Sequence, residues 1–252
     1  MKTPAIEVKT RSLGYTKIRE DQLLTFDHER VSKADFSKRK LLQLAAVGSR
    51  FEQCRFDKIR VESCSLGAGK ETSEYIDCSF DGARMHMGAG GYARFVRCSF
   101  RDVDLRDWYC FAVELVDCTF SGRLRKAIFN GAVRDDMQHA ARRTHNEFRG
   151  NDFSEIRLED VAFRTGVALT QQKLPTGPEY LYLPNAEATI QRARVEVMGW
   201  RDLELRQPAM GMIKSLEEEL LGDQHQLLLR LDDYPKSTRQ ADEALFALLR
   251  AS

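Results

Sequence analysis

A five-residue periodicity runs through more than half of this chain. Between Phe80 and Phe120, every fifth position carries a mostly large apolar residue, and the position two before it is mostly small or β-branched. The residues between them are mainly charged or polar. A period of five matches neither the two-residue period of a strand nor the 3.6-residue period of a helix. A single straight element therefore cannot hold these side chains on one face.

A longer repeat explains the short one. Three segments recur every twenty residues: Cys78-Ser79-Phe80, Cys98-Ser99-Phe100 and Cys118-Thr119-Phe120. Twenty residues with four inward-pointing units predict one turn of a four-sided coil. Successive coils are expected to stack about 4.8 Å apart, the spacing of strands in a sheet. The three phenylalanines should then form one vertical column and the three cysteines another.

The same period continues on both sides of this region, with two interruptions. It runs from Phe26 to Leu66 in another phase and returns from Phe148 to Ala168. The phase changes place a short break within 67–77 and a longer one at about 121–147. We expect a loop at a corner of the coil in each place, because a corner loop need not enter the core.

These residues carry a family resemblance. The segments Ala34-Asp35-Phe36, Cys54-Arg55-Phe56, Cys98-Ser99-Phe100 and Asn151-Asp152-Phe153 follow the loose pattern A-(D/N)-(L/F)-x-x. Over about residues 24–170 the chain resembles the pentapeptide-repeat proteins. The resemblance implies an all-β solenoid, a right-handed quadrilateral β-helix of about six coils, here interrupted by two loops and followed by a small C-terminal helical region.

The resemblance also implies a function. The best understood family members are rod-shaped dimers that protect bacterial type II topoisomerases, such as DNA gyrase, from poisons without doing covalent chemistry. This chain is thus expected to be a non-catalytic resistance or self-immunity factor with topoisomerase subunits as partners and no cofactor. The alternative is a generic scaffold that binds another protein through an aromatic patch or its C-terminal helices. A third possibility, an enzyme with a site between rod and C-terminal domain, has no supporting motif.

Changes in composition divide the chain into four parts. Residues 1–23 are expected to form an N-terminal cap that includes a strand at Ala5–Lys9, and 24–170 the β-helix. The proline-rich stretch 171–184 is predicted to be a linker, and 185–252 a helical domain or dimerisation element.

Helical spacing is expected to continue from Ile213 through Leu231, with Pro208 in a first turn and a break at Gly222. Leu245 and Leu249 belong to an apolar stripe that either forms a homodimer or docks on the open end of the β-helix.

Three regions supply candidate partner-binding residues. The first is the short break, and the second is the run that begins at Trp108, where Trp108 replaces a small inward residue above the glycine-rich stretch Gly88-Ala89-Gly90-Gly91. The outward aromatic residues there form either a binding hot spot or a patch covered by a loop or by the C-terminal domain. The third is the loop 121–146, with six basic residues against two acidic ones. The candidates are Lys70, Glu71, Trp108, Tyr109, Phe111, Arg125, Lys126, Met137, Arg142 and Arg143.

No motif predicts a metal or catalytic site. The cysteines are spaced by the coil and not as C-x₂₋₄-C pairs, so they are expected to be structural. Gly67-Ala68-Gly69-Lys70 lacks the upstream glycine and the following Ser or Thr of a phosphate-binding loop and is predicted to be a surface loop.

Composition sets the remaining limits. The 252 residues carry a net charge of +1, so the chain as a whole gives no electrostatic case for binding nucleic acid or membrane. Residues 24–170 hold 24 basic and 22 acidic residues, unlike the acidic, DNA-like surface common in topoisomerase protectors. The loop 121–146 is expected either to contact DNA phosphates or an acidic protein, or to be solvated. Without an apolar leader or an apolar run of about 18 residues, the chain is expected to be cytoplasmic.

Overall fold

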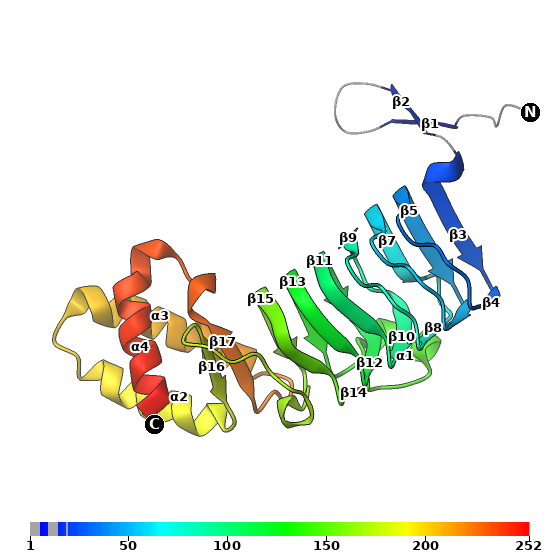
Figure 1. Ribbon diagram of the computed structural model, residues 1–252. Helices are drawn as coiled ribbons and strands as arrows, with labels where there is room; N and C mark the ends of the chain where they lie inside the picture. The colour runs from blue at the N-terminus through cyan, green and yellow to red at the C-terminus, as the bar shows by residue number, and fades with distance from the viewer. Residues whose placement is uncertain (1–5, 10–14, 19, 252) are drawn as a thin grey trace, which may run out of the picture.

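The computed structural model describes residues 6–9, 15–18 and 20–251 (Figure 1), and its main body is a parallel β-solenoid, as expected. One wall of the solenoid is a seven-stranded parallel sheet, in which each strand pairs with the strands one coil away. Its strands are β3 (Leu23–Asp27), β5 (Lys40–Val47), β7 (Arg60–Ala68), β9 (Arg84–His86), β11 (Ser99–Cys110), β13 (Thr119–Asn130) and β15 (Asp152–Arg164).

The second wall is a six-stranded parallel sheet of shorter strands. They are β4 (Arg30–Ser32), β6 (Arg50–Glu52), β8 (Ser73–Ile76), β10 (Tyr92–Val96), β12 (Ala112–Val116) and β14 (Phe148–Arg149). Phe51 pairs with Tyr75, whereas Val31 pairs with Phe51. The offset thus changes from 20 to 24 residues, because the coil between β6 and β8 holds the short insertion.

The left-handed backbone conformation at the corners produces the five-residue period. One corner is occupied in successive coils by Lys33, Gln53, Asp77, Arg97 and Asp117, with φ between 52° and 56°, and then by Gly150 with φ 66°. A residue in this conformation turns the chain sharply. Each side of the coil therefore contains only a few extended residues before the next turn, and its inward side chains recur every five positions.

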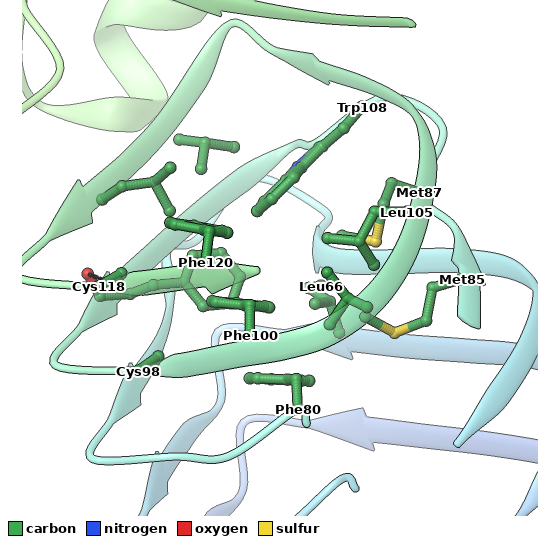
Figure 2. Close-up of a cluster of buried hydrophobic side chains, with 14 of the residues drawn as sticks. Leu66, Phe80, Met85, Met87, Cys98, Phe100, Leu105, Trp108, Cys118 and Phe120 are labelled. Atoms are coloured by element: carbon green, nitrogen blue, oxygen red, sulfur yellow. Dashed lines mark hydrogen bonds between the residues drawn. The ribbon is translucent and has the colours of Figure 1, made fainter. Parts of the chain in front are cut away.

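The core consists of columns of aromatic rings. Phe80, Phe100 and Phe120 lie one above another (Figure 2), with ring centroids 4.8 and 4.9 Å apart and planes within 4° of parallel. The column extends from Phe36 to Phe153 at centroid spacings of 4.7 to 5.0 Å. The predicted phenylalanine column is confirmed, and the interior between the sheets is filled with side chains.

The cysteine column is also present, and its thiols are hydrogen-bonded. Cys98 Sγ donates to the carbonyl of Tyr75 at 3.3 Å, and Cys118 Sγ donates to the carbonyl of Phe95 at 3.6 Å. All six cysteines are buried and free. Their structural role, expected from their spacing, is therefore supported by their surroundings.

A two-stranded antiparallel sheet closes the C-terminal end of the solenoid. It pairs β16 (Tyr180–Leu183) with β17 (Leu227–Arg230). One face, with Tyr180 and Leu228, packs on the solenoid core, whereas Leu181 and Leu229 pack on the helices. The helices are α2 (Ala186–Met198), α3 (Leu203–Glu219) and α4 (Arg239–Ala251).

Several predictions for this end of the chain are wrong. Part of the expected linker 171–184 is strand β16, and the leucines at 227–229 form strand β17 instead of continuing a helix. Helix α3 begins at Leu203, five residues before Pro208, with the Asp202 carboxylate accepting the N–H of Glu204. It ends at Glu219, ahead of the predicted break at Gly222, whose φ is 73°.

Leu245 and Leu249 do not form a dimerisation surface. They are only 0% and 2% exposed, because α4 packs its apolar stripe on α2 and α3. The stripe does not dock on the solenoid end either, since β16 and β17 lie between. Where the structure describes side chains, the exposed large apolar residues are Val195, Met198, Leu203 and Leu221.

The N-terminal strand prediction is confirmed in its described part. Strand β1 (Ile6–Lys9) pairs antiparallel with β2 (Tyr15–Ile18). Residue Ala5, also predicted to be in this strand, lies outside the described residues. In Figure 1 the pair lies beyond the first coil of the solenoid, and its role as a cap stays a prediction.

Candidate protein-interaction site

Both insertions leave the solenoid at the same corner. The first follows β7 and precedes β8, and the second follows β13 and precedes β14. In each case the chain passes from the seven-stranded to the six-stranded sheet. Three coil steps separate the two insertions, or about 14 Å at the usual strand spacing. The two loops therefore project from a single edge of the rod, which we call the loop edge.

The longer insertion is shorter than expected. The sequence predicted a loop over 121–147, but β13 continues to Asn130 and pairs with both β11 and β15. The insertion proper is the segment 131–147, which contains helix α1 (Asp135–Ala141). The helix packs Met137 and Ala141 against Tyr92 and Ala112 of the six-stranded sheet.

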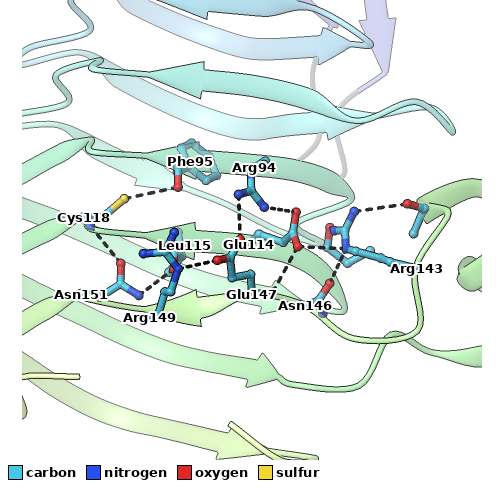
Figure 3. A network of polar contacts seen from close by, with 12 residues as sticks. Arg94, Phe95, Glu114, Leu115, Cys118, Arg143, Asn146, Glu147, Arg149 and Asn151 are labelled. Carbon is cyan, nitrogen blue, oxygen red and sulfur yellow. Dashed lines mark hydrogen bonds and ion pairs between the residues drawn. The ribbon is translucent and has the colours of Figure 1, made fainter. Parts of the chain in front are cut away.

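A half-buried ionic network fastens this insertion to the rod (Figure 3). The guanidinium of Arg94 donates to Glu114 at 2.8 Å and to Glu147 at 2.7 Å. Arg143 lies 3.4 Å from Glu114 and donates to the carbonyl of Ala112 at 2.8 Å. The carboxylate of Glu114 is only 9% exposed, so these partners compensate the loss of its hydration. The network thus fastens the C-terminal part of the insertion to the rod.

Arg143 consequently has a structural role, which corrects its prediction as a partner-binding residue. Burial lowers the pKa of its guanidinium, and the nearby Arg94 acts in the same direction, while Glu114 opposes both effects. Its Nε also donates to Asn146, whose side-chain amide donates to the carbonyl of Phe111. Arg142, the next residue toward the N-terminus, is exposed. Of these two arginines, Arg142 is the one available for a partner.

The aromatic run is only partly exposed. Trp108 is 1% exposed and packs on Phe95 and Phe129, so it cannot contact a partner directly, and its prediction as a binding residue is wrong. The glycine-rich coil below makes room for it, because a Cβ on Gly90 would lie 3.2 Å from its Nε1.

The other two aromatic residues of this run, Tyr109 and Phe111, are half-buried. The ring of Phe111 is covered by the insertion, with the guanidinium carbon of Arg134 5.2 Å from the ring centroid. Tyr109 lies on the outer side of β11, above Ala89 as expected. Tyr109 and Phe111 therefore do not form the open patch that a binding hot spot would require. The α1 insertion covers part of this pair.

The shorter insertion places Lys70 and Glu71 on the loop edge, both exposed. Glu71 Oε2 lies 3.3 Å from Nε2 of His28. Hydrogen bonds to Asp27 and Glu71 raise the pKa of His28. The segment Gly67-Ala68-Gly69-Lys70 does not lead from a strand into a helix, but only its second half is the expected surface loop. Gly67 and Ala68 end strand β7, with Gly67 buried, whereas Gly69 and Lys70 are exposed.

Arg125 and Lys126 do not belong to the loop edge. They lie on β13, on the outer face of the seven-stranded sheet, and Arg125 pairs with Asp104 at 2.7 Å. The loop edge thus unites Lys70, Glu71, Phe111, Met137 and Arg142, whereas Arg125 and Lys126 belong to another surface. The sequence did not separate Arg125 and Lys126 from Met137 and Arg142, because all four fall within one apparent break in the five-residue period.

Three of the buried thiols are poorly suited to chemistry. Burial raises the pKa of Cys64, Cys98 and Cys110, which disfavours the reactive thiolate. Within the described ranges, His, Cys, Asp and Glu side chains form no group of three arranged to hold a metal ion. In the same part of the chain, no helix has both the length and the apolar character needed to cross a membrane.

Comparison with known proteins adds no relative. No protein-family model matches the chain, and no curated protein matches it significantly. The fold and the loop edge therefore define the class of this protein: a parallel β-solenoid with a corner insertion anchored by ion pairs and with a C-terminal helical unit.

Proposed function

We propose that this protein is a non-catalytic binding protein whose solenoid serves as a rigid rod and whose loop edge contacts a protein partner. The observation that carries the proposal is the position of the two insertions at one corner, with the α1 insertion fastened by Arg94, Glu114 and Arg143. A loop that is already ordered loses little conformational entropy when it binds. Such a loop on a stiff support is suited to recognition.

The packed interior supports a binding role more than an enzymatic one. Stacked rings fill the solenoid from Phe36 to Phe153, and the thiols are buried. Enzyme sites usually occupy a concave pocket with a few convergent polar groups and titratable groups of shifted pKa. A hollow of about 860 Å³ on the described surface is lined instead by charges, most of which pair with one another.

For the partner, we propose a bacterial type II topoisomerase, with the protein acting as a resistance or self-immunity factor. The support is the resemblance to pentapeptide-repeat proteins together with a rod that carries loops along one edge. The alternative is a scaffold that uses the same edge for another protein. In both cases the protein acts by contact and not by covalent chemistry.

The test combines drug tolerance with partner capture. Expression in a sensitive bacterium should raise tolerance to a gyrase poison, and the purified protein should retain gyrase subunits on a column. The double variant Lys70→Glu/Arg142→Glu reverses two exposed charges on the loop edge and should lose both effects. The control Arg201→Glu/Lys214→Glu makes the same change in charge on the C-terminal unit and should keep them.

The outcomes distinguish the two partners. Unchanged drug tolerance together with no captured topoisomerase would refute the topoisomerase proposal. Capture of another protein that depends on the same two loop-edge residues would favour the scaffold. Binding that both variants retain equally would exclude the loop edge itself.

A further inference from the structure

A column of unpaired basic side chains follows the outer face of the seven-stranded sheet. Lys40, Arg60 and Arg84 occupy the same position in three consecutive coils. Arg106 lies two residues along from this column, in the next coil. All four are exposed, and none makes an ion pair or side-chain hydrogen bond with any residue of the described chain.

The six-stranded sheet is arranged differently over most of its length. From Arg50 onward, basic and acidic residues alternate from coil to coil, so Arg50 pairs with Glu74, and Arg94 pairs with Glu114. The solenoid thus pairs most of the charges in this register of the six-stranded wall and leaves Lys40, Arg60, Arg84 and Arg106 on the seven-stranded wall unpaired. Four like charges at neighbouring positions repel one another, so the fold alone gives no reason to collect them.

The column lines an extended groove. A hollow of about 380 Å³ is lined by Lys40, Arg60, Arg84 and Arg106, and also by Arg125. Arg125 lines a second hollow as well, of about 860 Å³, together with residues of β15 and of the C-terminal unit. Ten basic and six acidic side chains line the two hollows, an excess of positive charge on a chain whose net charge is only +1.

The acidic residues of this groove are largely engaged already. Asp104 accepts from Arg125 at 2.7 Å, and Glu159 pairs with Arg157, also at 2.7 Å. These pairs lie on β11, β13 and β15. The four free basic side chains lie on β5, β7, β9 and β11, and the one acidic residue lining the first hollow besides Asp104 is Glu62. An anionic ligand in the first hollow would therefore find basic side chains that have no acidic partner.

The regular spacing of the column points to a polymer of anions. Three strand steps separate Lys40 on β5 from Arg106 on β11, or about 14 Å at the strand spacing. A duplex rises 3.4 Å per base pair, so this length spans about four base pairs. A guanidinium group can donate two parallel hydrogen bonds to the oxygens of one phosphate. A folded acidic protein would have to repeat its carboxylates along the same straight line, which a phosphodiester backbone does by its covalent structure.

We propose that this groove binds the phosphate backbone of a nucleic acid without reading its sequence. The proposal goes beyond the protein partner of the loop edge, because it uses a different face of the rod. Arg125 and Lys126, which the sequence placed in a loop, lie on β13 and line this groove. Backbone contacts of this kind position a protein on a nucleic acid but carry no base specificity.

Fluorescence anisotropy with labelled 20-base-pair duplex DNA tests the proposal, with duplex RNA and single-stranded DNA of equal length as further probes. The full chain should bind at 50 mM salt, and the logarithm of the binding constant should fall linearly with that of the salt concentration. The variant Arg60→Gln/Arg84→Gln/Arg106→Gln should weaken binding at least tenfold. It should also reduce the salt slope by about 2 to 3, near 0.9 for each phosphate that the variant no longer neutralises.

The matched control, Lys33→Gln/Arg201→Gln/Lys214→Gln, removes three exposed positive charges outside the groove and should change the affinity less than threefold. Thermal unfolding of both variants verifies that each is folded. Equal weakening by both variants would overturn the proposal, because net charge and not the groove would then determine binding. No binding to any of the three nucleic acids, or binding to poly-glutamate as tight as to DNA, would overturn it as well.

Discussion

Asn151 takes the place of a cysteine in the column above Cys118. Its side-chain Oδ1 accepts the backbone N–H of Cys118 at 3.0 Å, and its Nδ2 donates to the carbonyl of Leu115 at 2.8 Å. One coil earlier, the thiol of Cys118 donates to the equivalent carbonyl, that of Phe95. The side-chain amide of Asn151 thus makes the same kind of hydrogen bond as the thiols, to a backbone carbonyl of an earlier coil. It adds a hydrogen bond to the Cys118 N–H, in the coil that follows the α1 insertion.

This geometry predicts unequal effects of two substitutions at Asn151. Asn151→Leu leaves the Leu115 carbonyl and the Cys118 N–H buried without a side-chain partner, so it should lower the free energy of unfolding by about 1–3 kcal/mol. Asn151→Cys keeps the bond to Leu115 and should be less destabilising. Urea denaturation measures both, and a leucine variant as stable as the wild type would contradict this account.

Gly131 and Gly211 should respond in opposite directions to alanine. A Cβ on Gly131 would lie 2.4 Å from the carbonyl oxygen of Thr165, so Gly131→Ala must displace backbone in the next coil and should destabilise the solenoid. A Cβ on Gly211 meets nothing within 4 Å. Gly211→Ala in the exposed part of α3 should therefore stabilise by about 0.5–1 kcal/mol. Thermal unfolding compares the two, and a stabilised Gly131→Ala protein would show that the coils are less closely packed.

The six cysteines should be unreactive in the folded protein. All are buried, and burial raises the pKa of Cys64, Cys98 and Cys110. At pH 8 a thiol reagent such as DTNB should label none of them before unfolding and all six in denaturant. Rapid labelling of any cysteine without denaturant would mean that the coils open locally.

His28 should titrate above its ordinary range. Hydrogen bonds to Asp27 and then to Glu71 raise its pKa, so these contacts favour the protonated ring. Their stabilising effect is fully present below the usual pKa and disappears as pH rises through the raised one. NMR titration of the ring should show a lower pKa in Glu71→Gln, with a smaller effect from Glu74→Gln as control. An unchanged pKa in Glu71→Gln would exclude contact between His28 and the short insertion.

Arg143 and Arg142 form a matched pair for testing how the α1 insertion is held. Arg143→Met removes the ion pair with Glu114 and the bond to the Ala112 carbonyl, so amide hydrogen exchange across 132–147 should accelerate at least tenfold. Arg142→Met changes an exposed side chain and should leave exchange nearly unchanged. Equal exchange in the two variants would show that the packing of α1, and not the ionic network, holds the insertion.

The aromatic and cysteine columns were predictable from the sequence because they depend on local repetition. A coil of twenty residues places Phe80, Phe100 and Phe120 at the same point of each turn, and only a stacked arrangement buries all of them. The first break in the period was also located correctly. Its physical cause is simple, because a coil with extra residues must expel them at a corner.

The second break was misjudged because a bulge mimics a loop. Phe100 pairs with Phe120, an offset of 20, but Val103 pairs with Gly122, an offset of 19. A single missing residue shifts the phase of every residue that follows, although the strand continues to Asn130. The sequence shows the shift in phase, but only the pairing of β13 with its neighbours shows how the backbone absorbs it.

The sequence by itself determined the repeating core of this protein, since the spacing of apolar residues fixes which side chains point inward. The tertiary structure alone decided the surfaces. It buried Leu245 and Leu249 against α2 and α3, paired β16 with the distant β17, and aligned Lys40, Arg60 and Arg84 along one wall. Inward positions follow from local geometry, whereas partners on the outside depend on contacts between residues far apart in the chain.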